Sequence, residues 1–153
     1  MGLDMHLFKE TYIGANYIDV VKLEGVVQII QNGEVLPIKF NRLSNISEEV
    51  MYWRKANQIH NWFVKNYSEI NNNNLEGLYL DIEGLLELLK ICKKVDEDNT
   101  LAKELLPTTD GFFFGSTDYD DRYFNQIRST IVALEEILAE DNSHSYFKYS
   151  ASW

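Results

Sequence analysis

The chain has little cysteine and little histidine, and each scarcity excludes a class of site. Cys92 is the single cysteine among 153 residues, so an intramolecular disulfide and a metal cage of several thiolates are both excluded. The three histidines, His6, His60 and His144, are scattered, and no pair has the spacing of metal ligands. The sequence therefore predicts no metal site and no cofactor.

Basic residues are also in the minority, with 14 lysines and arginines against 24 aspartates and glutamates and a formal net charge of -10. General binding to DNA or RNA needs a basic surface, so this charge argues against it. A few convergent cations can still bind one small phosphorylated ligand in an acidic protein. No segment is long and apolar enough to cross a membrane, and the amino terminus lacks the pattern of a signal peptide. We therefore expect no membrane partner and a cytoplasmic location.

What the chain does contain is typical of a folded domain. Its residues are 45% hydrophobic and 25% charged, and 153 residues are enough to bury a core. Since no linker or internal repeat divides the chain, residues 1–153 are expected to form a single domain. Cys92 continues the apolar spacing of Leu85 and Leu88, which predicts a buried thiol rather than a nucleophile.

The first third of the chain reads as strands. Leu3, Met5 and Leu7 alternate with more polar residues, which is typical of a strand with one buried face. Asn32-Gly33 predicts a tight hairpin turn. The remaining expected or ambiguous segments are a strand at 17–23, hairpin arms at 26–31 and 35–40, and residues 43–50, which fit a strand or a loop.

The rest of the chain reads mainly as helices. Three substantial helices are expected to start near Trp53, Ile82 and Asp118, with a short strand at 78–80 and a shorter helix at 100–106. Residues 146–149 fit either a final edge strand or a mobile tail. Strands followed by helices favour an α+β fold, a mainly antiparallel sheet with about three helices packed on one side. The expected core comprises Leu3, Met5, Ile59, Phe63, Leu85, Leu88, Cys92, Ile127, Ile131 and Leu134.

Residues 53–66 contain the most unusual pattern. At helical spacing, Ile59 and Phe63 share a core face with Tyr52, Ala56 and Tyr67. Trp62 falls on the opposite side, among the cations Arg54, Lys55 and Lys65. Either this helix is covered on both sides, or Trp62 and its cationic neighbours form a surface for a ligand or partner.

Three blocks of the sequence resemble a family of small proteins from bacteriophages and prophages. They are residues 1–5 (MGLDM), residues 52–64 (YWRKANQIHNWFV), and residues 105–107 through 111–120 (LLP and GFFFGSTDYD). The resemblance implies a phage setting and brings no catalytic residues. Small accessory phage proteins commonly act on host defence, some by sequestering nucleotide-derived immune signals, others by inhibiting a host protein or serving nucleotide metabolism.

A nucleotide-like ligand needs an aromatic face for its base and cations for its phosphates. We therefore predict that Trp62, with Trp53, stacks on the ligand, that Arg54 and Lys55 pair with its charge, and that Asp118 and Tyr119 bond its polar edge. Arg54, Trp62 and Asp118 are expected to converge on one concavity, within or between subunits. The full candidate set is Trp53, Arg54, Lys55, Asn57, His60, Trp62, Phe113, Ser116, Thr117, Asp118 and Tyr119.

The polar run at 116–121 has two interpretations. Ser116 or Thr117 can cap the last helix, with the following aspartates in its first turn. Alternatively, backbone N–H groups there meet a ligand, for which the aspartates favour a ribose hydroxyl or an amine over an anion. In the preceding residues 112–114, a strand would place Phe112 and Phe114 on one face and Phe113 on the other.

The preferred function is thus a binding protein for a nucleotide-like ligand or a host defence protein. The alternative is an enzyme acting on a phosphorylated small molecule, with His60 as acid or base and Asp118 or a neighbouring aspartate as its partner. A protein inhibitor of a host defence component is the third option. The oligomeric state stays open, a homo-oligomer included.

Overall fold

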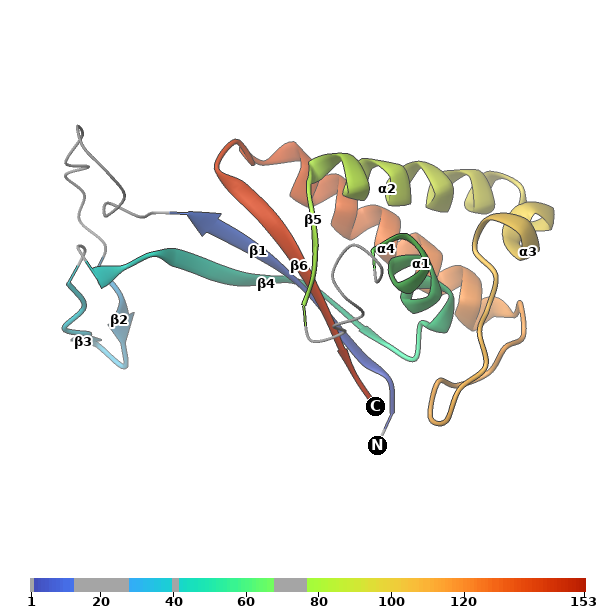
Figure 1. The fold of residues 1–153 in the computed structure, drawn as a ribbon, viewed down its shortest axis with the longest axis horizontal. Coiled ribbons are helices and arrows are strands. Elements are labelled where there is room, and N and C mark those ends of the chain that lie inside the picture. Colours follow the sequence, from blue (N-terminus) through green and yellow to red (C-terminus); the bar gives the residue numbers. More distant parts are fainter. Residues whose placement is uncertain (1, 13–27, 40–41, 68–76) are drawn as a thin grey trace.

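A four-stranded antiparallel sheet with helices on one face forms the main body of the protein (Figure 1). The structure is a computed structural model that describes residues 2–12, 28–39, 42–67 and 77–153. The strand order is β4-β1-β6-β5, and the fold is α+β as predicted. The strands are β1 (Asp4–Tyr12), β4 (Asn45–Arg54), β5 (Leu78–Leu80) and β6 (Ser145–Ser152). The main helices are α1 (Asn57–Tyr67), α2 (Ile82–Glu97) and α4 (Asp121–Ala139).

The alternation in β1 confirms the predicted strand. Met5 and Leu7 are fully buried toward the helices, whereas His6 and Phe8 lie half-buried on the opposite face. The C-terminal segment corrects the expectation of an edge strand or a tail, because β6 pairs with β1 on one side and β5 on the other. Its Phe147 and Tyr149 are fully buried at alternate positions, so the last strand completes the centre of the sheet.

Residues 45–54 form a strand, which resolves the ambiguity at 43–50 and corrects the predicted helix start near Trp53. The chain turns at Lys55, whose φ of 56° is in the left-handed region, and α1 begins at Asn57. Tyr52 therefore lies on a strand and is exposed. The prediction that Tyr52 shares the core face of this helix was wrong, because Tyr52 lies five residues before the helix that contains Ile59 and Phe63.

The Asn32-Gly33 hairpin is confirmed. It joins β2 (Ile30–Gln31) to β3 (Glu34–Val35), and both central residues have positive φ, 53° and 82°, as a type I′ turn requires. The strands are only two residues long, shorter than predicted, and the hairpin lies beyond the ends of β1 and β4 (Figure 1). The strand expected at 17–23 lies outside the described residues.

The helix starts follow from side-chain caps. Asp81 accepts from the Gly84 N–H and α2 begins at Ile82, as predicted. In α4 the cap is Asp120, which accepts from the Tyr123 N–H, so neither Ser116 nor Thr117 caps this helix. The predicted short helix at 100–106 is a 3₁₀ turn (Asn99–Leu101) followed by α3 (Ala102–Leu105).

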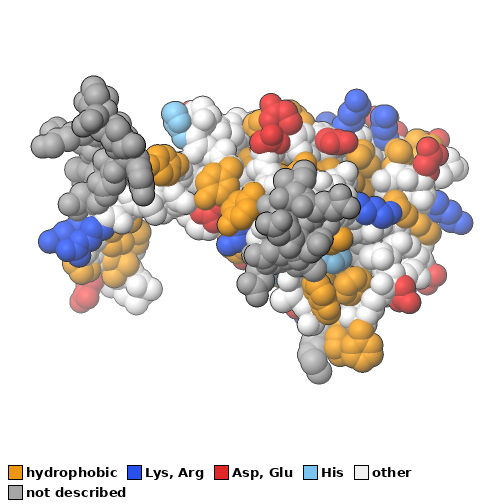
Figure 2. All heavy atoms as spheres, viewed as in Figure 1, with side chains coloured by type: hydrophobic (Ala, Val, Ile, Leu, Met, Phe, Trp, Pro, Cys, Tyr) orange, Lys and Arg blue, Asp and Glu red, His pale blue; other side chains and the backbone are white. Residues whose placement is uncertain are grey.

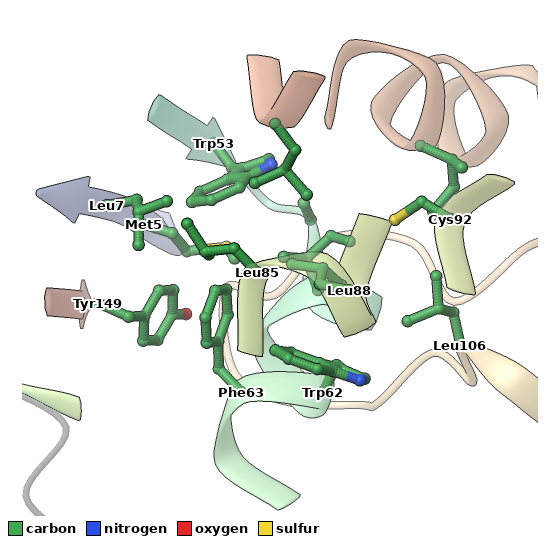
Figure 3. Close-up of a cluster of buried hydrophobic side chains, with 14 of the residues drawn as sticks. Met5, Leu7, Trp53, Trp62, Phe63, Leu85, Leu88, Cys92, Leu106 and Tyr149 are labelled. Atoms are coloured by element: carbon green, nitrogen blue, oxygen red, sulfur yellow. The ribbon is translucent and has the colours of Figure 1, made fainter. Parts of the chain in front are cut away.

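The core lies between the sheet and the helices (Figure 3). All the predicted core residues are buried except Ile131, which is half-buried at its edge. At its centre Phe63 stacks on Tyr149, with ring centroids 3.9 Å apart and an angle of 11° between the planes. Gly84 permits the close approach of α1 and α2, because a Cβ there would collide with the Tyr67 hydroxyl. Among the described residues, no helix combines the length and apolar character of a membrane span.

Candidate functional site

Trp62 is a core residue, not an exposed stacking surface. Its side chain is 6% exposed and contacts Phe63 edge-on, with centroids 5.2 Å apart. On its other side the indole lines a groove of about 250 Å³ together with Ile91 of α2 and Leu105 of α3. Helix α1 is thus covered on both sides, the first of the two possibilities that its sequence left open.

Asn57 holds the segment 106–120 against the start of α1. The side chain is 1% exposed, and its Nδ2 donates to the carbonyl oxygens of Phe114 (3.3 Å) and Ser116 (2.9 Å). Its Oδ1 accepts from the Thr109 N–H at 3.1 Å. Asn61 adds a bond from its Nδ2 to the Pro107 carbonyl oxygen. The predicted site residue Asn57 therefore uses its amide to position this segment.

His60 is a buried neutral imidazole. It is 4% exposed, its Nδ1 lies 2.7 Å from the Tyr149 hydroxyl, and it contacts the rings of Phe114 and Trp153 edge-on. Burial lowers its pKa from 6.5 to about 4. Among the described residues, no carboxylate forms a hydrogen bond or ion pair with it, and the Asp118 carboxylate instead accepts from Ser116 Oγ at 2.8 Å. The acid–base pair required by the enzyme hypothesis is not formed.

Other residues of the polar run at 116–121 form hydrogen bonds with residues that lie a short distance before them in the chain. The Tyr119 hydroxyl accepts from the Thr108 N–H, and the Thr117 carbonyl oxygen accepts from the Thr108 hydroxyl. Asp118 and Ser116 line a cavity with Lys55, but its volume is about 10 Å³, room for a water molecule only. The pocket predicted between α1 and residues 112–119 is therefore too small for a nucleotide.

Residues 112–114 form a turn rather than the predicted strand. Phe113 has a φ of 73°, its carbonyl oxygen accepts from the Leu3 N–H, and the Phe114 N–H donates to the Gly111 carbonyl oxygen. Phe112 is exposed and Phe114 is half-buried against Trp153. The glycines on either side permit this turn, since a Cβ on Gly111 would strike the Phe114 ring and Gly115 has a φ of 91°.

Among the hollows lined by the described residues, Arg54, Trp62 and Asp118 each line a different one and do not share the expected concavity. The largest of these hollows contains Arg54. This groove, about 480 Å³, runs between β4 and α4 and adds Arg122, which the sequence reasoning missed. We call it the Arg54–Arg122 groove. Its full lining is Met51, Tyr52, Trp53, Arg54, Arg122, Asn125, Gln126 and Ser129.

The sequence does contain a signal for the missed residues. Arg122, Asn125 and Ser129 recur at helical spacing, so they share one face of α4. The walls are joined beneath that face, because Gln126 Nε2 donates to the Arg54 carbonyl oxygen at 3.1 Å and Trp53 Nε1 donates to Thr130 Oγ1 at 2.8 Å. The Trp53 indole is buried and engaged, so it is not available to stack on a ligand.

The lining of the groove contains two arginines and no described acidic residue. Arg122 makes no ion pair within the described part of the chain, although it also lines the small cavity that contains Asp118 and Asp120. Arg54 lies 3.8 Å from Asp4, a long and exposed ion pair that a stronger anion can displace. The Tyr52 hydroxyl donates to Asp4, and this bond raises the Tyr52 pKa. Asp4 is therefore shared between Tyr52 and Arg54.

No group of three or more potential metal ligands occurs within the described ranges. In comparisons with known proteins, no family model, no curated protein and no solved structure matches this chain.

Proposed function

We propose that this protein binds and sequesters a small, phosphorylated, nucleotide-like ligand in the Arg54–Arg122 groove. The observation that carries the proposal is local charge: in a chain with a net charge of -10, this groove is lined by two arginines and by no described acidic residue. Guanidinium groups pair with phosphate through two parallel N–H bonds. Arg54 lies on the edge strand β4 and Arg122 lies on α4, so a ligand with one or more phosphates can pair with either guanidinium group.

The size and remaining chemistry of the groove support the same ligand class. A volume of about 480 Å³ is within the range of small-molecule sites. Tyr52 also lines the groove and is 45% exposed, and its ring contacts the ring of His6, with centroids 5.2 Å apart. Asn125 and Ser129 supply an amide and a hydroxyl for the polar edges of a base or sugar.

Binding without turnover is favoured over catalysis by the lining of the groove. Its described residues include no histidine, cysteine, lysine or carboxylate, the groups most often used as general acids, bases and nucleophiles. The resemblance of the sequence blocks to phage proteins supports counter-defence as the setting. In that setting the ligand is a nucleotide-derived immune signal, held away from its host receptor.

The proposal is tested by purifying the protein from a host-cell extract, denaturing it and analysing the released small molecules by mass spectrometry. We expect a phosphorylated nucleotide-like molecule in stoichiometric amount. Incubation of the native protein with that molecule should leave it unaltered over time, whereas turnover would support the enzyme alternative. Release of no phosphorylated molecule from the wild-type protein would contradict the proposal.

A further inference from the structure

Two phenylalanines at one end of the molecule are exposed to solvent. Phe112 is 80% exposed and Phe113 is 36% exposed, and their rings meet edge-on with centroids 4.3 Å apart. We call these two residues the aromatic tip. Hydrophobic side chains gather at the lower edge of the main body in Figure 2, where the segment 108–116 lies in Figure 1.

The aromatic tip is held in place by the residues around it. The Phe113 carbonyl oxygen accepts from the Leu3 N–H at 3.2 Å, and the next carbonyl, of Phe114, accepts from the buried amide of Asn57. Before the tip, the Gly111 N–H donates to the Asp110 carboxylate at 2.9 Å. A fixed tip loses little conformational entropy when it binds, which is the advantage of preorganisation.

The conformation of Phe113 is also unfavourable in isolation. Its φ of 73° is in the left-handed region, where a bulky side chain costs on the order of 1 kcal/mol or more. Glycine would fit this position without strain, and a polar residue would suit the solvent at position 112. Aromatic side chains are enriched among the residues that contribute most to binding in protein interfaces, so two exposed phenylalanines on a fixed turn suit that role.

The charge of the residues next to the aromatic tip limits the kinds of partner that can bind it. Asp110 directly precedes the tip and makes no ion pair among the described residues, whereas Asp118 and Asp120 line a small cavity with Lys55 and Arg122. The carboxylate of Asp110, in a chain with a net charge of -10, repels an anionic membrane surface or a nucleic-acid backbone. A symmetric pair of copies would bring the Asp110 carboxylates of the two copies together, and these like charges disfavour it. A basic partner gains from the same carboxylate.

We propose that the aromatic tip inserts into an apolar pocket, rimmed by lysine and arginine side chains, on another protein. This surface is separate from the Arg54–Arg122 groove, since neither phenylalanine lines that groove. The protein would therefore present two binding surfaces, one for an anionic small molecule and one for a basic protein. If experiments disprove binding at one of these two surfaces, the proposal for the other surface is unaffected.

The test places the photoreactive analogue p-benzoylphenylalanine at position 112 and irradiates host cells that produce the full chain. Mass spectrometry then identifies the cross-linked protein and the cross-linked position. Cross-linking to another protein does not by itself support the proposal. The cross-linked position on that protein must also lie in an apolar pocket with lysine or arginine at its rim. A cross-link only to a second copy of this chain, or no cross-linked protein, would overturn the proposal.

Affinity measurements with the purified partner complete the test. Phe112→Ser should raise the dissociation constant about tenfold or more. Asp110→Asn keeps an acceptor for the Gly111 N–H but removes the charge, so it should raise the constant by a smaller factor that shrinks as salt is added. Val132→Ser, at a 57% exposed position on α4, is the matched control and should change nothing. Equal affinities for wild type and Phe112→Ser would overturn the proposal.

Discussion

The buried amide of Asn57 donates to the carbonyl oxygen of Ser116 over 2.9 Å, joining the first turn of α1 to a segment 59 residues further along the chain. Two more bonds from the same side chain, with Phe114 and Thr109, make this residue the main attachment of residues 108–116. The position of the aromatic tip therefore depends on a side chain in a different element.

Asn57→Ala should lower the free energy of unfolding by about 2–4 kcal/mol, because three partly buried hydrogen bonds to the backbone are lost together. Urea denaturation measures the loss, and amide hydrogen exchange should rise selectively at residues 108–116. Asn61→Ala removes a single bond, to the Pro107 carbonyl oxygen, and is expected to cost only about 1 kcal/mol. Equal costs for the two variants would show that Asn57 does not have the assigned role.

Trp62→Ala should destabilise the protein by about 3–5 kcal/mol, because it empties a large space in the core. Trp153 is 52% exposed, so Trp153→Ala is the comparison and should cost much less. Thermal unfolding followed by circular dichroism distinguishes the two. An unchanged melting temperature in Trp62→Ala would place the indole on the surface, in conflict with the structure.

Periodic patterns predicted the parts of the fold that depend on local geometry. The alternation of Met5 and Leu7 indicated β1, the Asn32-Gly33 pair indicated the hairpin, and the helix expected to start near Ile82 is α2. Each of these patterns spans only a few neighbouring residues, so it can be recognised in the sequence without knowledge of the tertiary structure.

The candidate site was harder to predict because its walls come from distant segments. The cationic neighbours of Trp62 suggested an exposed face, yet the indole is 6% exposed and belongs to the core cluster, against which Ile91 of α2 and Leu105 of α3 also pack. Arg54 lies in a groove, as expected, but its companion is Arg122 rather than Trp62 or Asp118. That pairing follows from the packing of α4 against β4, which no local pattern encodes.

Acid should destabilise the protein through His60. Its pKa is about 4 in the folded chain and 6.5 when unperturbed, so protonation favours the unfolded state. The contribution of the neutral ring is fully present above pH 6.5 and is lost as the pH falls toward 4. Between pH 7.5 and 5 the free energy of unfolding should fall by about 1–2 kcal/mol from this group.

The control for that prediction is His60→Asn, which keeps a hydrogen-bonding group near the Tyr149 hydroxyl but does not titrate. His6 and His144 are common to both proteins, so the difference in pH dependence reports on His60. If urea denaturation gives parallel curves for both proteins between pH 7.5 and 5, the imidazole is not buried in neutral form.

Cys92 should be unreactive in the folded protein. Its side chain is fully buried and burial raises the pKa of the thiol to about 12, so almost no thiolate is present at neutral pH. Ellman's reagent should modify it only at the rate of global unfolding and at once in denaturant. Rapid modification of the native protein would show that the helix packing around α2 opens easily.

Retention of the ligand by arginine variants tests the account most directly. The wild-type protein, the double variant Arg54→Ala/Arg122→Ala and the control Lys93→Ala are purified in parallel from host cells, and the phosphorylated small molecules they release are quantified by mass spectrometry. Lys93 lies on α2, pairs with Glu135 and does not line the Arg54–Arg122 groove. We predict that the wild type and Lys93→Ala retain equal amounts of the ligand, while the double variant retains about tenfold less with an unchanged melting temperature. Full retention by the double variant, or an equal loss in Lys93→Ala, would contradict the assignment of the groove.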